Sequence, residues 1–245
     1  MPGEALDRRI ATPEGKRQYV RTLFATIADR YDFITVALSY GQDQRWKRRL
    51  VRMASLRPGL WALDLATGTG DIAFACAGQG ARVVGLDITE RMIEQACARK
   101  AALGSRAPGA LQFLVGDMLA LPFPAGSFDL VTTGYGLRNV PNLATALEEI
   151  QRVLRPGGRL LSLDFNRPAN GVVRSVYLAY LGAVGGLLGW VLHGDPDTYR
   201  YIPASIRQYP GAEAVVRMMQ SRGFSRTAYQ PVLGGLMAIH DGVRD

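Results

Sequence analysis

Side chains that bind metals or form disulfides are scarce in this sequence. Only two histidines and two cysteines occur among its 245 residues. Cys76 and Cys97 lack the spacing of paired metal ligands, so neither a metal site nor a disulfide framework is predicted. Both fall in segments expected to be helical, where we predict buried thiols in a reducing compartment. Because residues 1–9 are polar and charged, we expect no secretory signal and a cytoplasmic location.

Signatures of several other enzyme classes are missing as well. No Lys-Ser or Lys-Thr follows the glycines at positions 68 and 70, which excludes a phosphate-binding Walker loop. No Tyr-x-x-x-Lys pair occurs, which argues against a dehydrogenase. Neither cysteine follows a proline, and no Asn/Asp-Pro-Pro-aromatic run occurs, so we expect no methylation of nucleic-acid bases and no nucleic-acid partner. A binding module without catalytic activity stays an alternative.

Acidic residues are outnumbered, with 21 against 29 lysines and arginines and a net charge of +8. Most of the arginines are dispersed, and one run is dense. We expect this run to form a helix with a solvated basic face, and contact with an anionic membrane surface is the alternative. The basic residues of this run are Arg45, Lys47, Arg48, Arg49 and Arg52. The apolar residues on the opposite side of the expected helix are Trp46 and Leu50.

The sequence has no apolar run long enough for a confident membrane span. The uncharged stretch at residues 176–192 is 17 residues long, whereas a spanning helix needs about 20. It contains four glycines and lies late in the chain. We expect a helical cap over a lipophilic substrate, in contact with lipid, and ordinary core packing is the alternative.

A glycine-rich turn organises the chain. Residues 61–65 read as a buried strand, and Asp71 begins a helix, with Gly68 and Gly70 between them. Asp87 follows Gly70 by 17 residues, at the end of a second apolar run. A carboxylate at this spacing suits the two hydroxyls of a ribose, so the pattern predicts a nucleoside-cofactor site. The glycines also fit a dinucleotide fingerprint, but the helical residues before this strand favour another cofactor over NAD.

Alternating strand and helix signals predict a Rossmann-like, doubly wound α/β fold with a mostly parallel, seven-stranded sheet. The length suits a single domain over residues 1–245. We expect a helical N-terminal cap at 15–57, a cofactor-binding core at 60–165, a substrate cap at 166–210, and a final helix with closing strands at 211–245. The expected strands are 61–65, 83–86, 111–115, 128–133, 159–164, 225–230 and 234–240. The expected helices include 15–31, one from 42, one from 71, 89–103, 143–154 and 211–222.

Ligands of such sheets bind beyond the carboxyl ends of the parallel strands. The residues expected at or just past those ends are Thr67, Asp87, Asp117, Gly134, Arg138 and Asp164. His240 falls on a final strand that we expect to be antiparallel, so its end lies at the opposite edge. We interpret His240 as structural.

Taken together, these motifs resemble those of class I S-adenosylmethionine-dependent methyltransferases. The similarity rests on residues 64–71, Asp87, 116–118 with 121–124, and 156–158. More narrowly, the chain is similar to the C-methyltransferases of ubiquinone and menaquinone biosynthesis from about residue 19 to 242. The segments that carry this likeness are Tyr31-Asp32 with Trp46-Lys47, GYGLRNV at 134–140, Tyr199-Arg200-Tyr201-Ile202 with Ser205-Ile206 and Pro210, and Gly234-Gly235 with Ala238-Ile239-His240.

The resemblance implies S-adenosylmethionine as cofactor and a polyprenyl quinol as substrate. Demethylmenaquinol is the expected acceptor, with another small lipophilic acceptor as the main alternative and an NAD-dependent dehydrogenase as a weaker one. Contact with the inner face of a membrane and a homo-oligomer are both compatible with the sequence. The implied cofactor-binding residues are Asp64, Thr67, Gly68, Thr69, Gly70, Asp87, Asp117, Met118 and Gly134, and the implied catalytic residues are Arg138, Asn139 and Tyr31.

The chain departs from the family pattern in the N-terminal cap. Where relatives usually have Met-Asn-Asp, it has Ile34-Thr35-Val36, and a usual His-Arg pair is Asp43-Gln44. Many relatives also carry a hydroxyl residue at the position of Gly134. These departures bear on the acceptor more than on the cofactor.

Overall fold

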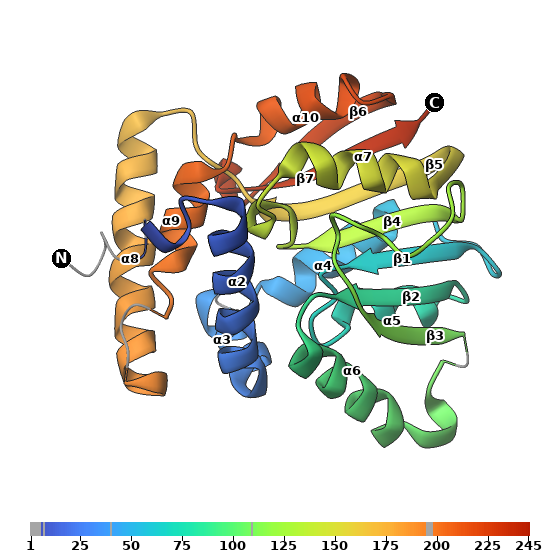
Figure 1. Ribbon diagram of the computed structural model, residues 1–245, viewed down its shortest axis with the longest axis horizontal. Helices are drawn as coiled ribbons and strands as arrows, with labels where there is room; N and C mark the ends of the chain where they lie inside the picture. The colour runs from blue at the N-terminus through green and yellow to red at the C-terminus, as the bar shows by residue number, and fades with distance from the viewer. Residues whose placement is uncertain (1–5, 7, 40, 109, 195–197) are drawn as a thin grey trace.

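The computed structural model describes residues 6, 8–39, 41–108, 110–194 and 198–245, and a seven-stranded sheet forms its centre (Figure 1). The strand order is β3-β2-β1-β4-β5-β7-β6. β1 to β5 run parallel, and β7 is antiparallel to both β5 and β6. The predicted doubly wound, mostly parallel sheet is therefore confirmed. The strands are β1 Trp61–Leu65, β2 Arg82–Asp87, β3 Leu111–Val115, β4 Phe128–Gly134, β5 Leu154–Phe165, β6 Phe224–Val232 and β7 Met237–Arg244.

Helices cover both faces of the sheet because successive strand residues point to opposite sides. On β1, Ala62 packs toward α4 (Asp43–Met53) and α5 (Asp71–Ala77). Leu63 and Leu65 pack on the other face, toward α7 (Leu143–Val153) and α10 (Ala212–Gln220). Asp64 shares the side of Ala62, so a buried carboxylate faces α4 and α5. α6 (Glu90–Ala102) connects β2 with β3 by way of a short 3-10 turn, Gly104–Arg106.

Four further helices gather beyond the carboxyl ends of the parallel strands (Figure 1). α2 (Pro13–Ile27) packs on α9 (Tyr201–Gln208) through a cluster that includes Val20, Tyr201 and Ala204. α8 (Gly171–His193) packs on α9 through Leu178, Leu181 and Ile206. α3 (Tyr31–Leu38) follows α2 after the 3-10 turn Ala28–Arg30.

Three predicted element boundaries are wrong. The first helix ends at Ile27, a 3-10 turn follows, and Tyr31 begins α3 instead of ending α2. Because no glycine or proline interrupts residues 27–38, helical backbone continues past the expected end at Tyr31. β5 starts at Leu154, before the expected 159, because Leu154 pairs with Phe128 and the Pro-Gly-Gly segment bulges within the strand. Gly234 and Gly235 lie in a 3-10 turn at φ of 64° and 91°, a left-handed conformation that glycine tolerates, and not in β7.

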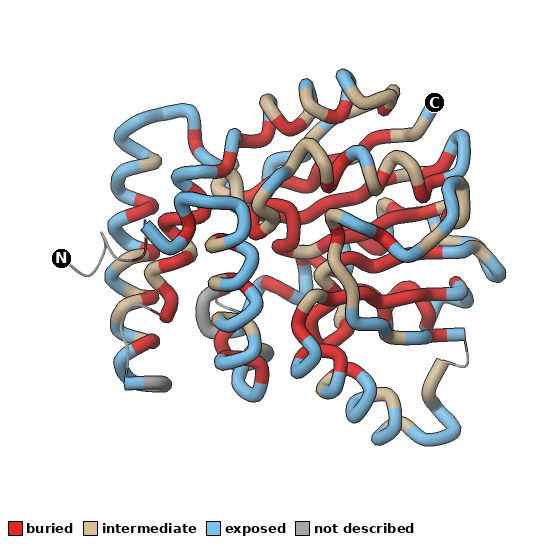
Figure 2. The backbone as a smooth tube through the Cα atoms, in the orientation of Figure 1, coloured by how far each residue is buried: buried red, intermediate tan, exposed pale blue. Residues whose placement is uncertain are grey.

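The structure also decides two predictions about burial. Cys76 is buried as expected, whereas Cys97 is exposed on α6, so that prediction is wrong. The long apolar helix is not core: α8 is exposed along much of its outer side (Figure 2), and only 28% of its most apolar window is buried. Among the described residues it is the one helix long and apolar enough to cross a membrane, judged by length and composition alone.

Candidate functional site

Three hollows meet at the carboxyl edge of the sheet. The largest, with a volume of about 730 Å³, lies between the N-terminal helices, α8, α9 and the turn after β6. A second, of about 80 Å³, lies above β1, β2 and β4, and a third, of about 10 Å³, lies beside the glycine turn. Tyr31 and Tyr135 line all three hollows. These two rings therefore mark the point where ligands from different hollows would touch.

The carboxylate of Asp87 holds the glycine turn against β2. Its Oδ2 accepts a hydrogen bond from the Gly68 amide at 2.9 Å, and its Oδ1 accepts one from the Thr89 amide at 2.9 Å. Burial raises the pKa of Asp87, and these amide donors oppose that shift. Gly68 and Gly70 adopt φ of 55° and 90°, which leaves bare backbone facing the hollow. Thr89 is the N-cap residue of α6, and its hydroxyl makes no cap hydrogen bond.

Asp117 and Met118 form the far wall of the second hollow. Oδ1 of Asp117 accepts from the Leu119 amide at 2.9 Å, and its Oδ2 lies 2.6 Å from Arg17 on α2. Met118 is 6% exposed and presents an apolar surface. This hollow suits an adenosyl group: Asp87 can bind the ribose hydroxyls, and Asp117 offers a second carboxylate beside the apolar surface of Met118.

Asp64, Thr67, Thr69 and Gly134 line the third hollow. The Asp64 carboxylate, 1% exposed, accepts hydrogen bonds from the hydroxyls of Thr132 at 2.8 Å and Thr67 at 2.7 Å. Burial raises the pKa of Asp64 to about 6, against the effect of these two donors. A Cβ on Gly134 would lie 2.8 Å from the Cδ1 atom of Ile72, so a larger residue there would require the Ile72 side chain to shift.

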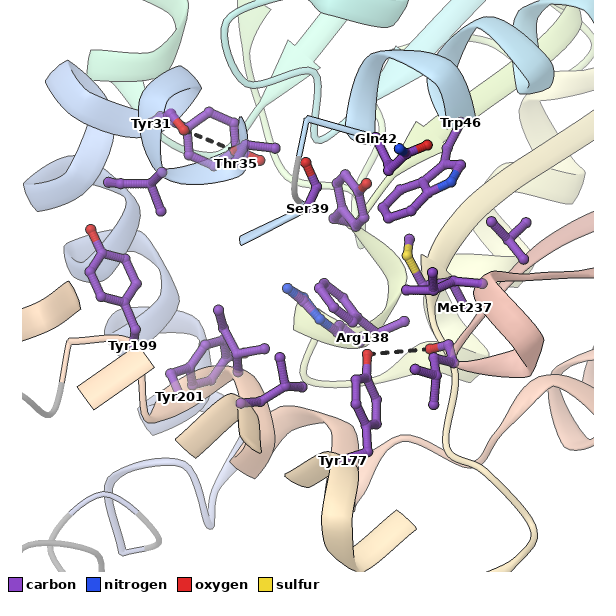
Figure 3. Close-up of a pocket in the computed structure, with 18 of the residues that line it drawn as sticks. Tyr31, Thr35, Ser39, Gln42, Trp46, Arg138, Tyr177, Tyr199, Tyr201 and Met237 are labelled. Carbon is purple, nitrogen blue, oxygen red and sulfur yellow. Dashed lines mark hydrogen bonds between the residues drawn. The ribbon is translucent and has the colours of Figure 1, made fainter. Parts of the chain in front are cut away.

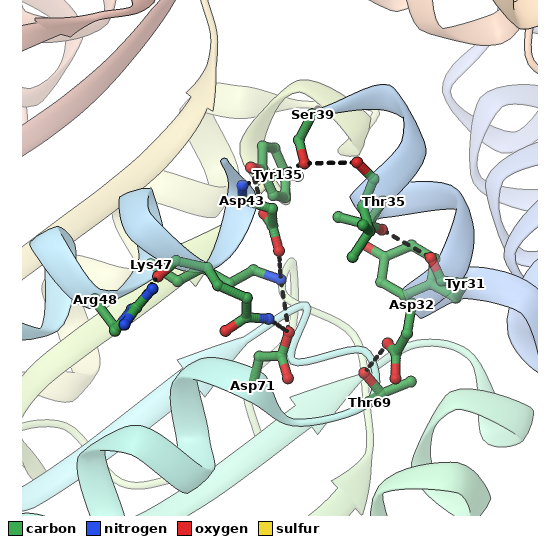
Figure 4. Close-up of polar contacts among 12 residues, drawn as sticks. Tyr31, Asp32, Thr35, Ser39, Asp43, Lys47, Arg48, Thr69, Asp71 and Tyr135 are labelled. Atoms are coloured by element: carbon green, nitrogen blue, oxygen red, sulfur yellow. Dashed lines mark hydrogen bonds and ion pairs between the residues drawn. The ribbon is translucent and has the colours of Figure 1, made fainter. Parts of the chain in front are cut away.

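A buried ionic network lies between the glycine turn and the N-terminal helices (Figure 4). Lys47 Nζ lies 2.7 Å from Asp43 and 2.9 Å from Asp71, and the Tyr135 hydroxyl donates to Asp43 at 2.7 Å. Although burial opposes its charge, the neighbouring Tyr31, Asp43 and Asp71 raise the pKa of Lys47. The prediction that Lys47 belongs to a solvated face is therefore wrong, whereas Arg45, Arg48, Arg49 and Arg52 are exposed.

Arg138 reaches the wall of the largest hollow, with its guanidinium toward the interior (Figure 3). The residue is 6% exposed, its Nε lies 3.5 Å from Asp164 Oδ1, and its Cζ lies 4.7 Å from the centre of the Phe165 ring. Its backbone amide donates to Asp164 Oδ2 at 3.1 Å. Arg138 thus pairs with Asp164 and also faces the cavity, so one side chain can both brace the fold and contact an acceptor.

Asn139 does not line the cavity that would hold the acceptor. It lines the second hollow and not the largest one. Its Nδ2 donates to the Tyr135 carbonyl at 2.8 Å, and its Oδ1 accepts from Arg138 Nη1 at 3.2 Å. The side chain therefore braces Arg138 and the backbone of Tyr135.

His240 is buried in the core, and its Nε2 lies 3.2 Å from the Ala212 carbonyl. Desolvation lowers the pKa of His240 to about 4, which keeps the ring neutral. This position, on an antiparallel strand away from the hollows, supports the structural interpretation. Among the described residues, no three potential metal-ligating side chains cluster together.

The sequence predicts no role for Tyr135, and Asp43 stands out in it only as a departure from the family pattern. The signal for Tyr135 was its place next to Gly134 in the GYGLRNV segment. The signal for Asp43 was a lone acid next to a basic run. Their hydrogen bond joins residues 92 positions apart, so no local pattern could reveal it.

Comparison with known proteins gives a consistent family. The model of the ubiE/COQ5 methyltransferase family matches residues 13–244. A protein of Thermus thermophilus named demethylmenaquinone methyltransferase is 42% identical over 224 residues, covering 91% of this chain and 100% of that protein. A protein of Ectopseudomonas mendocina named ubiquinone/menaquinone biosynthesis C-methyltransferase UbiE is 38% identical over 232 residues, covering 94% of this chain and 90% of that protein.

Solved structures share the fold. The magnesium protoporphyrin IX methyltransferase of Synechocystis PCC 6803 with bound SAH has a TM-score of 0.65 at 20% identity, covering 94% of this chain and 100% of that one. A SAM-dependent methyltransferase of Thermotoga maritima has a TM-score of 0.64 at 18% identity, covering 92% of this chain and 100% of that one. At these identities the likeness establishes the architecture, which is that of class I methyltransferases.

Proposed function

Because the chain belongs to the ubiE/COQ5 methyltransferase family, we propose that it methylates a ring carbon of a polyprenylated quinol, with demethylmenaquinol as the acceptor. It is a methyltransferase that depends on S-adenosylmethionine. The main support for a large lipophilic acceptor is the cavity of about 730 Å³. Arg138 lines this cavity, which meets the donor hollows at Tyr31 and Tyr135. Another lipophilic phenol of similar size is the second candidate, since the cavity wall is mainly apolar and aromatic.

The residues of the two smaller hollows fit the donor. Asp87 would accept hydrogen bonds from the ribose hydroxyls, and Asp117 with Met118 would flank the adenine. Asp64, Thr67 and Thr69, with the turn at Gly68 and Gly70, would surround the methionine part next to Gly134. When bound, S-adenosylmethionine supplies an electrophilic methyl group on a positively charged sulfonium.

Arg138 is the group suited to the acceptor's developing charge. Loss of a phenolic proton places negative charge on the oxygen and the adjacent ring carbon, and a guanidinium stays protonated in a dry site. An arginine is a weak base, so we assign proton removal to water and charge stabilisation to Arg138. Asn139 acts as a positioning residue through its contact with Arg138.

Tyr31 closes the junction between the hollows. Burial raises the pKa of Tyr31, so its hydroxyl stays protonated and can donate a hydrogen bond to a phenolate oxygen. Together with Tyr135 it keeps water from the reacting atoms. Because a polyprenyl tail is lipid-soluble, we propose a cytoplasmic enzyme with peripheral contact at the inner face of the membrane.

The redox state of the acceptor tests this function. Only the reduced quinol can form the phenolate, so labelled methyl transfer should require the quinol and fail with the oxidised quinone. The measurement incubates the enzyme and labelled donor with reduced demethylmenaquinone, its oxidised form kept free of reductant, and a reduced demethoxy-type benzoquinol. Equal turnover of the oxidised quinone would rule out the mechanism, and turnover of the benzoquinol alone would change the acceptor.

A further inference from the structure

The large cavity opens to solvent through a mouth formed by residues from three separate elements. Exposed residues that also line the cavity define this mouth. They come from α4 and its N-cap, from α8, and from the end of β6 with the turn that follows it. The mouth residues are Gln42, Arg45, Arg49, Arg52, Tyr180, Pro231 and Leu233.

The α4 side of the mouth carries unbalanced positive charge. Arg45, Arg49 and Arg52 recur at helical spacing, so they share one face of α4. Arg49 donates to Gln230 at 2.8 Å, and among the described residues the side chains of Arg45 and Arg52 have no hydrogen-bond or ion-pair partner. None of the described residues that line the cavity is acidic. The mouth is therefore complementary to an anion.

The α8 side of the mouth continues into an exposed apolar stripe. At about 100° per residue, four exposed apolar side chains of α8 lie within about 40° of Tyr180 around the helix. Their exposed fractions are 46% for Val173, 66% for Val176, 61% for Leu187 and 61% for Val191, and Tyr180 itself is 39% exposed. The stripe thus runs along the helix past the mouth.

We propose that the mouth and this stripe form one docking surface for an anionic lipid bilayer. The three arginines bind lipid phosphates, the α8 stripe enters the boundary between headgroups and acyl chains, and the cavity opens toward the bilayer. This inference rests on the proposed function. If the quinol ring binds where the hollows meet, its polyprenyl tail would extend out of the cavity through the mouth. Neither a basic patch nor an apolar stripe anchors a protein firmly alone, whereas the two together do.

A second copy of this chain is a poorer occupant. A symmetric dimer on this surface would place the same patch of each copy against the other. Arg45, Arg49 and Arg52 would then face their own counterparts across the interface, with no acidic residue among the described mouth residues to balance them. Like charges in a desolvated contact are unfavourable, so charge favours the bilayer.

Vesicle cosedimentation with the full chain tests the docking surface. The protein should bind vesicles of phosphatidylcholine mixed with phosphatidylglycerol, bind phosphatidylcholine vesicles far less, and dissociate as salt is raised. The triple variant Arg45→Gln, Arg49→Gln, Arg52→Gln should lose roughly fivefold in vesicle affinity for each arginine, on the order of a hundredfold in all. Val176→Ser with Leu187→Ser and Val191→Ser should weaken binding while the unfolding midpoint stays unchanged, since these side chains are exposed.

A charge-matched control separates the surface from the net charge. Arg48, Arg57 and Arg106 are exposed and do not line the cavity, so Arg48→Gln, Arg57→Gln, Arg106→Gln should retain most vesicle binding. Equal loss in both triple variants, equal binding to both lipid compositions, or a solution dimer dispersed by the serine variants would overturn the proposal. Vesicle binding needs no turnover, so a normal docking result with no quinol methylation would refute the function alone. Methylation of a detergent-solubilised quinol without vesicle binding would refute the docking surface alone.

Discussion

At the scale of single residues, Arg138 combines a structural contact with a place in the reaction cavity. Its partner Asp164 is fully buried, and burial raises the pKa of that carboxyl while Arg138 opposes the shift. Removing one member of a buried pair costs roughly 3–5 kcal/mol, because the remaining charge has no partner. A single substitution at Arg138 therefore confounds folding with catalysis.

A double substitution separates the two effects. Arg138→Ala should lower the free energy of unfolding by several kcal/mol and the single-turnover rate by about 10²–10³. Adding Asp164→Asn removes the stranded charge, so it should restore most of the stability and none of the rate. Arg138→Lys should recover only part of the rate, because a point charge replaces a planar fork. A double variant that is stable and turns over normally would show that Arg138 only braces the fold.

Asp64 predicts a pH dependence of donor binding. Its pKa of about 6 arises from burial, and a nearby ammonium group on the donor would lower it. Binding then releases a proton wherever the free carboxyl is protonated, so donor affinity should fall by up to tenfold for each pH unit below about 6. Titration calorimetry with S-adenosylhomocysteine across this range gives the slope. Asp64→Asn should bind more weakly and lack this component of the slope, and an identical slope in that variant would place the titrating group elsewhere.

At the scale of elements, the Lys47 network joins α4 to the start of α5. The Lys47 side chain is 10% exposed and the Asp43 side chain 2% exposed, so their charges depend on each other. Lys47→Met should cost about 3–5 kcal/mol in the free energy of unfolding. The matched control on the same helix is Arg48→Met, an exposed position that should change it by less than about 0.5 kcal/mol. Denaturant unfolding measures both, and similar small losses would mean that the network adds no stability.

The same network sets a limit in acid. Burial disfavours the charge of Asp71, but Lys47 and Arg99 lower its pKa to about 2 from the usual 3.8. Between these values the unfolded chain binds more protons, so this contribution is complete above about pH 4 and is lost as the pH falls to about 2. In Lys47→Met the acid loss of stability should therefore be smaller than in the natural protein.

Local patterns predicted the elements that build the donor site. Residues 61–65 match β1 and 111–115 match β3, and Asp71 begins α5, because alternating burial and glycine turns are local properties. The helical residues before β1 lacked such a marker, so α3 was missed. The contacts that join Asp43, Lys47 and Tyr135 depend on how α4 packs beside β4. Residues far apart in the chain therefore formed the part of the site that the sequence did not predict.

At the scale of the whole molecule, the N-terminal helices bridge to the core on both sides of the donor hollows. Arg17 on α2 lies 2.6 Å from Asp117, and Asp32 on α3 accepts a hydrogen bond from Thr69 at 2.7 Å. Both core partners line donor hollows. A donor molecule in these hollows would lie next to both bridges, so we expect its entry and exit to involve movement of the N-terminal helices.

This arrangement predicts a kinetic effect without a large change in affinity. The exposed Arg17–Asp117 ion pair contributes up to about 1 kcal/mol and the Asp32–Thr69 hydrogen bond about 1 kcal/mol, so Arg17→Ala with Asp32→Ala should raise the open population by up to about thirtyfold. Association and dissociation of S-adenosylhomocysteine should then both accelerate by similar factors, while the dissociation constant changes less than either rate. Glu14→Ala with Arg21→Ala is the control, since it removes one acid and one arginine from exposed positions on α2. Stopped-flow measurement of both rates distinguishes the cases: if only dissociation accelerates, the bridges hold the ligand itself and do not control access to it.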